Sequence, residues 1–302
     1  MPWLPEKVFV EKESLGYPLT GRILDRLAGI PVSVVHSAEE AFSDIRYSRD
    51  PVREAKKRLW LARQRGSFIK PCPCTPDHVR CGYDIINVNT GCPLDCTYCI
   101  LQDYLANPLV TVFVNVEDLR LEMDSYLSRK EGRVVRMGTG ELGDSLALDH
   151  LTGYSLELAG MIDGRKNVYL ELKTKTAGIR NIRKLDPSGN IIVSWSLNSI
   201  RAAGEEEHGA PSVEDRIRAA SLVSAEGFPV GFHFDPILHY PGWEEDYRAI
   251  VSRLFQAVSP RRIAWISLGS LRFPPSLKKT IRSRFPQSKA STAEFIKGRD
   301  GK

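Results

Sequence analysis

The chain has 302 residues, of which 42% are hydrophobic and 26% are charged, and this composition is typical of a folded protein rather than a disordered one. Its 42 basic and 37 acidic residues give a net charge of only +5, so charge alone does not indicate a nucleic-acid partner. The chain has no apolar run long enough for a transmembrane helix and no signal-peptide pattern, so we expect a cytoplasmic protein with no membrane partner.

The N-terminal part of the chain combines short strand-like and helical patterns, and we assign residues 1–83 to a small α/β extension. Strands are predicted over residues 8–10 and 30–35, a helix over residues 19–27, and a basic helix over residues 50–65. A loop rich in proline and cysteine follows over residues 70–82.

From residue 84 onwards, short apolar strands alternate with amphipathic helices. The predicted strands are 84–89, 109–115, 132–138, 167–173, 190–197, 229–235 and 262–268. The predicted helices are 117–130, 145–162, 212–226, 243–257 and 275–284. This alternation is typical of βα units around a parallel sheet. We therefore predict an α/β fold with a partial (β/α) barrel over residues 84–302, and chemistry at the C-terminal ends of its strands.

All six cysteines lie within residues 72–99, which in a reducing compartment indicates metal ligands or redox groups rather than disulfides. Cys92, Cys96 and Cys99 have the spacing C-x3-C-x2-C, directly after the first barrel strand. Three thiolates at this spacing can ligate three irons of a [4Fe–4S] cluster and leave the fourth iron open. The alternative is a zinc site, although zinc sites usually pair two close clips of ligands.

The other three cysteines form a second, weaker pattern. Cys72, Cys74 and Cys81, with His78 between them, could complete a tetrahedral zinc site or hold a second cluster. The alternative is a proline-rich loop with reduced thiols that packs onto the barrel, and we favour this interpretation.

The C-x3-C-x2-C motif, with Tyr98 just before its third cysteine, resembles the motif of the radical S-adenosylmethionine (SAM) superfamily. The resemblance implies that Cys92, Cys96 and Cys99 hold a [4Fe–4S] cluster whose open iron binds SAM. It implies that the reduced cluster cleaves SAM to a 5′-deoxyadenosyl radical, which abstracts a hydrogen atom from the substrate. It also implies that Tyr98 lies beside the adenine, and that an electron donor such as a flavodoxin or ferredoxin reduces the cluster.

The chain further resembles the spore photoproduct lyase family, from about Val8 to Ser283. These radical SAM enzymes split a methylene-bridged thymine dimer in DNA back into two thymines. The segments that carry the likeness are residues 100–102 (ILQ), 111–115 (TVFVN), 118–119 (DL), 149–152 (DHLT), 173–175 (KTK), 193–198 (VSWSLN), 242–244 (GWE) with Tyr247, and 272–274 (RFP).

The resemblance also implies residues that bind SAM. Lys175 matches a lysine of the family that contacts SAM, and Ser194 or Ser196 matches a serine on a barrel strand that also touches it. The alternative for these three residues is a solvated strand end.

The stretch from Gly138 to Glu141 resembles the superfamily's Gly-Gly-Glu type of motif, which binds the methionine amino group. A carboxylate facing an ammonium is a natural electrostatic match. The alternative for Gly138 and Gly140 is a simple turn at the end of a strand.

Two departures from the family concern the reaction and the length of the chain. Glu141 stands where the family's lyases carry the cysteine that returns a hydrogen atom to the product, and Ile100 stands where they carry a tyrosine. Either another donor serves, such as a tyrosine or a cysteine of the 72–81 loop, or the substrate differs. Family members also continue beyond Ile296, whereas six residues follow it here, which implies a chain truncated at its C-terminus.

DNA is the partner that the resemblance implies. The basic residues that could neutralise phosphates are Arg53, Lys56, Lys57, Arg58, Arg63 and Arg65, and Lys278, Lys279, Arg282 and Arg284. Arg272 and Phe273 could reach an extruded base. The alternative is that the charged runs are solvated helix faces.

Three hypotheses for the function follow. The first is a radical SAM enzyme of the spore photoproduct lyase type that acts on DNA. The second is a radical SAM enzyme on the same scaffold with a different substrate, which the replacement by Glu141 favours. The third is a non-enzymatic protein that binds an iron–sulfur cluster or zinc.

Overall fold

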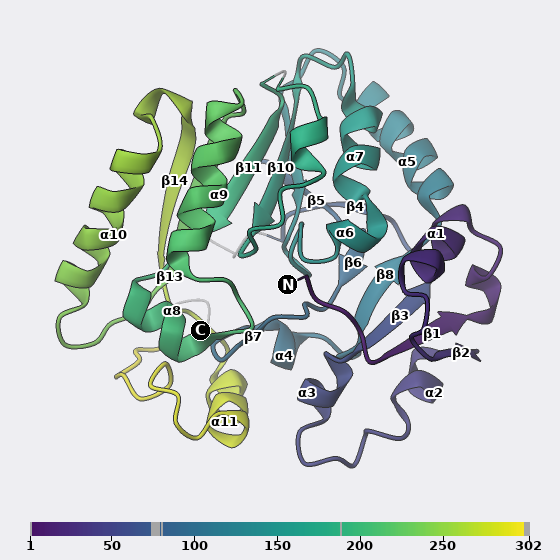
Figure 1. The fold of residues 1–302 in the computed structure, drawn as a ribbon, viewed down its shortest axis with the longest axis horizontal. Coiled ribbons are helices and arrows are strands. Elements are labelled where there is room, and N and C mark those ends of the chain that lie inside the picture. The colour runs from purple at the N-terminus through teal and green to yellow at the C-terminus, as the bar shows by residue number, and fades with distance from the viewer. Residues whose placement is uncertain (1, 74–78, 80, 188, 299–302) are drawn as a thin grey trace.

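The computed structural model describes residues 2–73, 79, 81–187 and 189–298, and Figure 1 shows two sheets that occupy its two halves. In these residues, the N-terminal sheet has the strand order β2 (Val32–Val35), β1 (Lys7–Glu11), β3 (Arg58–Ala62), β8 (Val110–Phe113) and β6 (Asn89–Thr90). The barrel sheet has the strand order β14 (Ile263–Ser270), β13 (Val230–Ile237), β11 (Ile191–Ser196), β10 (Val168–Thr174), β9 (Val135–Thr139), β5 (Tyr83–Ile86) and β4 (Ile69–Pro71). A short antiparallel pair joins β7 (Asp95–Cys96) to β12 (Glu207–His208).

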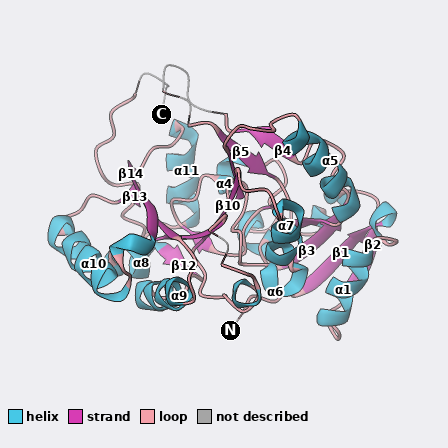
Figure 2. Cartoon of the chain, turned by 90° about the horizontal axis from the view of Figure 1, so that it is seen from above, coloured by secondary structure: helices cyan, strands magenta, loops and turns pink. Residues whose placement is uncertain are grey.

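The helices lie around these sheets, with α9 and α10 outside the curved barrel sheet in Figure 2. The α-helices are α1 (Pro18–Arg26), α2 (Ala38–Phe42), α3 (Pro51–Ala55), α4 (Leu101–Tyr104), α5 (Val116–Ser128), α6 (Asp149–Thr152), α7 (Tyr154–Ile162), α8 (Ile200–Glu206), α9 (Val213–Ala225), α10 (Trp243–Ala257) and α11 (Pro275–Arg284). The 3-10 helices are η1 (Lys12–Ser14), η2 (Ile182–Lys184) and η3 (Pro260–Arg262). Among the described helices, none combines the length and the apolar character needed to span a bilayer.

The predicted partial barrel is confirmed. Strands β5, β9, β10, β11, β13 and β14 are parallel to their neighbours, and the sheet ends at β14 on one side and at the antiparallel β4 on the other. Because side chains alternate along a strand, Leu170 and Leu172 of β10 face the helices, and Glu171 and Lys173 face the inside of the barrel. The C-terminal ends of the strands therefore surround a polar interior.

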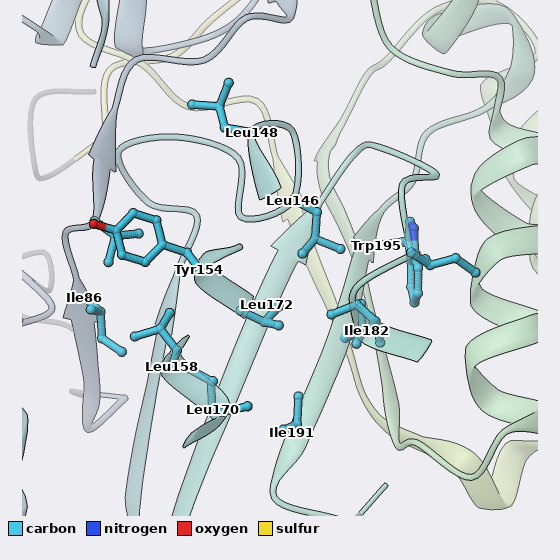
Figure 3. Packing of buried hydrophobic residues seen from close by; sticks show 14 of the residues in the cluster. Ile86, Leu146, Leu148, Tyr154, Leu158, Leu170, Leu172, Ile182, Ile191 and Trp195 are labelled. Carbon is cyan, nitrogen blue, oxygen red and sulfur yellow. The ribbon is translucent and has the colours of Figure 1, made fainter. Parts of the chain in front are cut away.

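A hydrophobic core continues from one sheet to the other. Figure 3 shows Leu170 and Leu172 packed against Leu158 of α7 and near Ile86 of β5. The same cluster of buried residues includes Val8 and other residues of the N-terminal sheet. The two sheets therefore share one core.

Each sheet also includes strands from both sides of residue 83 in the sequence. The N-terminal sheet takes β6 and β8 from beyond this residue, and the barrel sheet takes β4 from before it. A division into two domains at residue 83 stays a prediction, and the shared core connects the two parts closely.

Three predicted elements are wrong in part. The basic helix predicted over residues 50–65 ends at Ala55, and residues 58–62 form β3, because the buried Leu59 and Leu61 alternate with half-buried neighbours as a strand requires. The strand predicted over residues 109–115 is present as β8, but it pairs with β3 in the N-terminal sheet rather than joining the barrel.

The helix predicted over residues 145–162 is two helices. Gly153 adopts a left-handed φ of 70° and separates α6 from α7. The buried Asp149 side chain accepts hydrogen bonds from the backbone N–H of Ser155, at 2.8 Å, and from its hydroxyl, at 2.7 Å, and so fixes the bend.

Candidate functional site

The cluster loop, residues 91–99, begins where β6 ends and contains β7. Cys96 is buried, Cys92 and Cys99 are half-buried, and all three belong to one apolar cluster with Tyr98 and Leu238. Burial raises the pKa of Cys92 to about 12 and the pKa of Cys96 well above its usual range. Burial therefore favours the protonated form of the Cys92 and Cys96 thiols, and iron binding must displace their protons.

The donor chemistry of this loop fits a [4Fe–4S] cluster. Cys92, Cys96 and Cys99 come from one loop and belong to one group of buried and half-buried apolar side chains, and thiolates are the usual ligands of iron–sulfur clusters. In the described part of the chain, no three His, Cys, Asp or Glu side chains converge as a ligand set for a single metal ion. Cys92, Cys96 and Cys99 stay the predicted cluster ligands.

The loop is shaped by a close contact with the N-terminal sheet. Gly91 has a φ of 76°, and a Cβ at this position would lie 2.6 Å from the carbonyl oxygen of Leu109. Its N–H donates to the carbonyl of Leu142 at 2.8 Å. A glycine is therefore required directly before the first cysteine.

Glu206 ties the cluster loop to a segment near the C-terminal end of the chain. Its carboxylate accepts hydrogen bonds from the hydroxyl of Thr97, from the hydroxyl of Ser288 at 2.6 Å and from the N–H of Lys289 at 2.8 Å. Its backbone carbonyl accepts the N–H of Thr97 at 2.8 Å. The carboxylate is buried, and these donors compensate for its loss of water.

Glu207 connects two residues that the resemblance assigns to SAM. Its carboxylate accepts the Tyr98 hydroxyl, lies 3.6 Å from the Lys175 ammonium and pairs with Arg216 at 2.6 Å. The Lys175 ammonium also lies 5.8 Å from the centre of the Tyr98 ring. Burial alone would raise the pKa of Glu207, but Lys175 and Arg216 outweigh burial and lower this pKa. The structure therefore brings Tyr98 and Lys175 together through Glu207.

Sequence reasoning missed both of these buried glutamates. They stand in a run of three acidic residues, 205–207, which is usually read as a solvated helix end. The available signal is Arg216, an arginine on the otherwise buried side of α9, because a buried cation needs a buried anion nearby.

Glu141 is already engaged in an ion pair. Its carboxylate accepts the Lys173 ammonium at 2.6 Å, and the two side chains are 37% and 23% exposed. Burial would lower the pKa of Lys173, but the charge and hydrogen bond of Glu141 raise it. The structure thus places Glu141 just after the C-terminal end of β9, beside Lys173.

Gly138 and Gly140 have steric reasons to be glycine. A Cβ on Gly138 would lie 2.2 Å from the Tyr83 hydroxyl and 2.4 Å from the carbonyl oxygen of Glu171. Gly140 has a φ of 100°, in the left-handed region. Close packing therefore explains both positions, and the cofactor-binding role stays a prediction.

The two candidate serines lie at different depths in the barrel. Ser194 is fully buried beside Glu171, and its hydroxyl has no hydrogen-bond partner among the described residues. Ser196 ends β11, and its carbonyl accepts Arg216 at 3.1 Å. Ser196 is therefore nearer to the Glu207 network, and Ser194 belongs to the deeper layer.

A buried network crosses this deeper layer. His233 of β13 lies 2.7 Å from the Glu171 carboxylate through Nε2 and 2.8 Å from the Ser267 hydroxyl through Nδ1. Burial would raise the pKa of Glu171, but the hydrogen bond and charge of His233, together with the charge of Lys173, outweigh burial and lower the pKa to about 2.

A cavity of about 880 Å³ lies beside the cluster loop, at the C-terminal ends of β13 and β14. Its lining shares Ala202, Leu238, Tyr240, Leu271 and Ala290 with the apolar cluster of Cys96 and Tyr98. Arg272 and Phe273 also line it, and their predicted contact with an extruded base stays a prediction. Phe273 is only 6% exposed and packs in a cluster with Leu277 and Ile281.

Most of the basic residues expected to face DNA have carboxylate partners within the protein. The ion pairs are Lys56–Asp95, Lys57–Glu54, Arg58–Asp44, Arg63–Asp118, Arg65–Glu11 and Arg284–Asp50. Arg53, Lys279 and Arg282 are exposed and have no ion pair among the described residues. The predicted basic faces therefore carry less uncompensated charge than the sequence suggests.

The second cysteine group lies partly outside the described residues. Cys74 and His78 are not described, whereas Cys72 is half-buried and Cys81 is exposed. A zinc site or second cluster at this loop stays a prediction.

An open barrel of parallel strands, with a three-cysteine loop at the C-terminal ends of the strands, defines the class of radical SAM proteins. The model of the spore photoproduct lyase family matches residues 3–299. The chain belongs to this family, whose members are radical SAM enzymes that use a [4Fe–4S] cluster and SAM.

Curated relatives and solved structures agree with this assignment. The chain is 26% identical to the spore photoproduct lyase of Geobacillus sp. (strain Y412MC61), over 97% of this chain and 86% of that protein. It is 25% identical to the enzyme of Bacillus subtilis (strain 168), with the same coverage. The structure of a spore photoproduct lyase complexed with dinucleoside spore photoproduct is 23% identical, matches with a TM-score of 0.86, and covers 99% of this chain and 89% of that chain.

The Arg216–Glu207 pair is expected to be a large contributor to stability. Replacing Arg216 by Met leaves Glu207 buried with weaker compensation, so we expect a loss of about 3–5 kcal/mol in the free energy of unfolding. Arg218→Met is the matched control, because Arg218 is 71% exposed and its pair with Asp215 is worth at most about 1 kcal/mol. Urea titration of both variants measures the difference, and equal losses would contradict the assignment.

Gly138→Ala is expected to destabilise the protein, because the added methyl group overlaps Tyr83 and the backbone at residue 171. We expect a loss of about 1–3 kcal/mol, seen as a lower melting temperature in circular dichroism. Gly160→Ala in α7 is the control: its Cβ meets no atom within 4 Å, and it is expected to gain up to about 1 kcal/mol. An unchanged melting temperature with loss of SAM binding would assign Gly138 to the cofactor instead.

Glu171 is expected to make stability depend on pH. Its pKa of about 2 in the folded protein lies below the ordinary 4.5, so its contribution is complete above pH 4.5 and is lost as the pH falls towards 2. The contribution above pH 4.5 is roughly 3 kcal/mol by linkage. Urea titrations between pH 6 and pH 3, which cover the upper part of the interval from pH 4.5 to pH 2, are expected to show a shallower loss of stability for Glu171→Gln than for the unmodified protein. If the free energy of unfolding falls equally with pH in both proteins, the Glu171 carboxylate contributes nothing to the pH dependence of stability.

Proposed function

We propose that this protein is a radical SAM enzyme that reverses the spore photoproduct, a thymine dimer, in DNA in the cytoplasm. The observation that supports this most strongly is the position of the large cavity, whose lining includes residues that also pack against Cys96 and Tyr98. A substrate in the cavity would therefore lie next to the place where the cluster is predicted. Related lyases have been solved with dinucleoside spore photoproduct bound.

When bound, the cluster and SAM together supply a 5′-deoxyadenosyl radical that removes a hydrogen atom from the substrate. In this proposal Cys92, Cys96 and Cys99 hold the cluster. A donor such as a flavodoxin or ferredoxin reduces it. Lys175 and Tyr98 bind SAM in an orientation fixed by Glu207. Such preorganisation reduces the motion required at the moment of reaction.

The cavity has the chemistry of a site for an extruded nucleotide. Apolar and aromatic side chains such as Tyr240 line it and could contact a base, while Lys278 and Lys297 at the lining could meet phosphate oxygens. An enzyme that acts on a base within DNA must extrude that base from the stack.

A second candidate is a radical SAM enzyme of the same scaffold with a different substrate. The Glu141–Lys173 ion pair favours it, because the resemblance places a hydrogen-donor cysteine at position 141. A carboxylate that accepts a hydrogen bond from an ammonium has no hydrogen atom to return to a product. The two candidates share the roles of the cluster and SAM and differ only in what enters the cavity.

The test is an anaerobic assay of the reconstituted, reduced protein with SAM and a dinucleotide spore photoproduct. The proposal predicts release of thymine products, and formation of 5′-deoxyadenosine without thymine would favour the second candidate. Glu141→Cys is expected to raise thymine release at least about tenfold, because a thiol is a far better hydrogen-atom donor than a carboxyl group.

Glu141→Ser is the matched control, since it removes the carboxylate without adding a thiol. An equal gain in both variants would show that the carboxylate merely obstructs the site. Absence of both 5′-deoxyadenosine and a SAM-dependent change in the EPR signal of the reduced cluster would reject both enzymatic candidates and favour a non-enzymatic binding protein.

A further inference from the structure

Two cationic side chains that are far apart in the sequence contact the cluster loop. The first is Lys56, which follows α3. Its ammonium donates to the backbone carbonyls of Cys92, at 2.8 Å, and Leu94, at 2.6 Å, and lies 3.7 Å from the Asp95 carboxylate. These three residues are the first cysteine and two of the three spacer residues of the C-x3-C segment, so one side chain contacts most of that segment.

The second cation is Arg284, the last residue of α11. Its Nε–H group donates to the two carboxylate oxygens of Asp50 at 2.9 and 3.1 Å. Its Nη2 donates to the two carboxylate oxygens of Asp95 at 3.1 and 3.2 Å. The third nitrogen donates to the side-chain oxygen of Gln102, just after the loop, at 2.7 Å. Arg284 therefore links the N-terminal extension, the loop and α11.

We call Lys56, Arg284, Asp50 and Asp95 the charge clasp. These side chains are only 12%, 7%, 21% and 18% exposed, respectively, so water screens their charges much less than it would at the surface. Two positive and two negative charges balance within the clasp. Removing one of them leaves a single uncompensated charge of known sign beside the loop.

We propose that the charge clasp positions the Cys92–Cys96 segment and sets the reduction potential of the cluster bound there. Reduction adds one electron and makes the cluster more negative, so a nearby positive charge favours the reduced state and a nearby negative charge opposes it. Lys56 holds the backbone of a predicted ligand directly, and Asp95 lies between two of them. The inference depends on the cluster but not on which substrate the enzyme uses.

The charge clasp also restrains the backbone of the loop. The Cys92 and Leu94 carbonyls lie in a partly buried loop, and Lys56 donates to both of them. Without this donor the loop loses the interactions that hold it against α3, and the thiols lose part of their preorganisation.

The test compares Lys56→Met with Asp95→Asn in full-length, reconstituted protein, by EPR-monitored redox titration. Lys56→Met leaves a net negative charge and is expected to lower the midpoint potential, whereas Asp95→Asn leaves a net positive charge and is expected to raise it. For each variant we expect about a tenfold change in the reduction equilibrium, or about 59 mV for one electron. A purely structural disturbance would not shift the potential in opposite directions.

Lys57→Met is the matched control, because Lys57 is 39% exposed and pairs with Glu54 and Glu6 rather than with the loop. Its potential and iron content are expected to match those of the unmodified protein. Lys56→Arg keeps the charge and is expected to restore both the potential and the iron content lost in Lys56→Met.

Shifts of the same sign in Lys56→Met and Asp95→Asn, or shifts no larger than that of Lys57→Met, would overturn the inference. If Lys56→Met retains too little iron for titration, the comparison of Asp95→Asn with the unmodified protein decides the electrostatic part. An unchanged or lowered potential in Asp95→Asn then overturns it, and a raised potential supports it.

Discussion

The candidate site depends on the compensation of one buried carboxylate, that of Glu207. A carboxylate without water is stable only when cations and hydrogen-bond donors surround it, and here Tyr98, Lys175 and Arg216 do so. Each donor comes from a different element: the cluster loop, the end of β10 and the helix α9. The charge of Glu207 is compensated only when all three elements are in place, so its burial links correct folding to correct assembly of the site.

The cluster loop is likewise held by residues from distant parts of the sequence. Glu206 joins it to the segment at Ser288, Arg284 joins it to α11, and Lys56 joins it to the N-terminal extension. The loop has apolar contacts of its own through the buried Leu94, Cys96 and Tyr98. Polar bonds to its backbone and to Asp95 add rigidity and connect the loop to the N-terminal extension and to α11.

Local patterns were enough to predict the barrel and its cysteine motif. The strands from β9 to β14 and the helices α9 to α11 follow apolar periodicity that a short window of sequence contains. The missed features depend on partners far along the chain: Glu207 meets Tyr98 across 109 positions, and Arg284 meets Asp50 across 234. The predicted helix over residues 50–65 failed because a basic run concealed the two-residue alternation around Leu59 and Leu61, whose burial arises from sheet pairing.

The residues predicted to take part in radical generation differ in their surroundings from the residue predicted at the hydrogen-donor position. The residues predicted to hold the cluster and SAM are tied to buried charges, so a substitution among them disturbs folding as well as chemistry. Glu141 differs, since it is 37% exposed and its carboxylate pairs with Lys173 of the neighbouring strand β10. In the proposed function, a substitution there changes the hydrogen donor offered to the substrate and touches no partner of Glu207. The scaffold can therefore preserve radical generation while its final step varies.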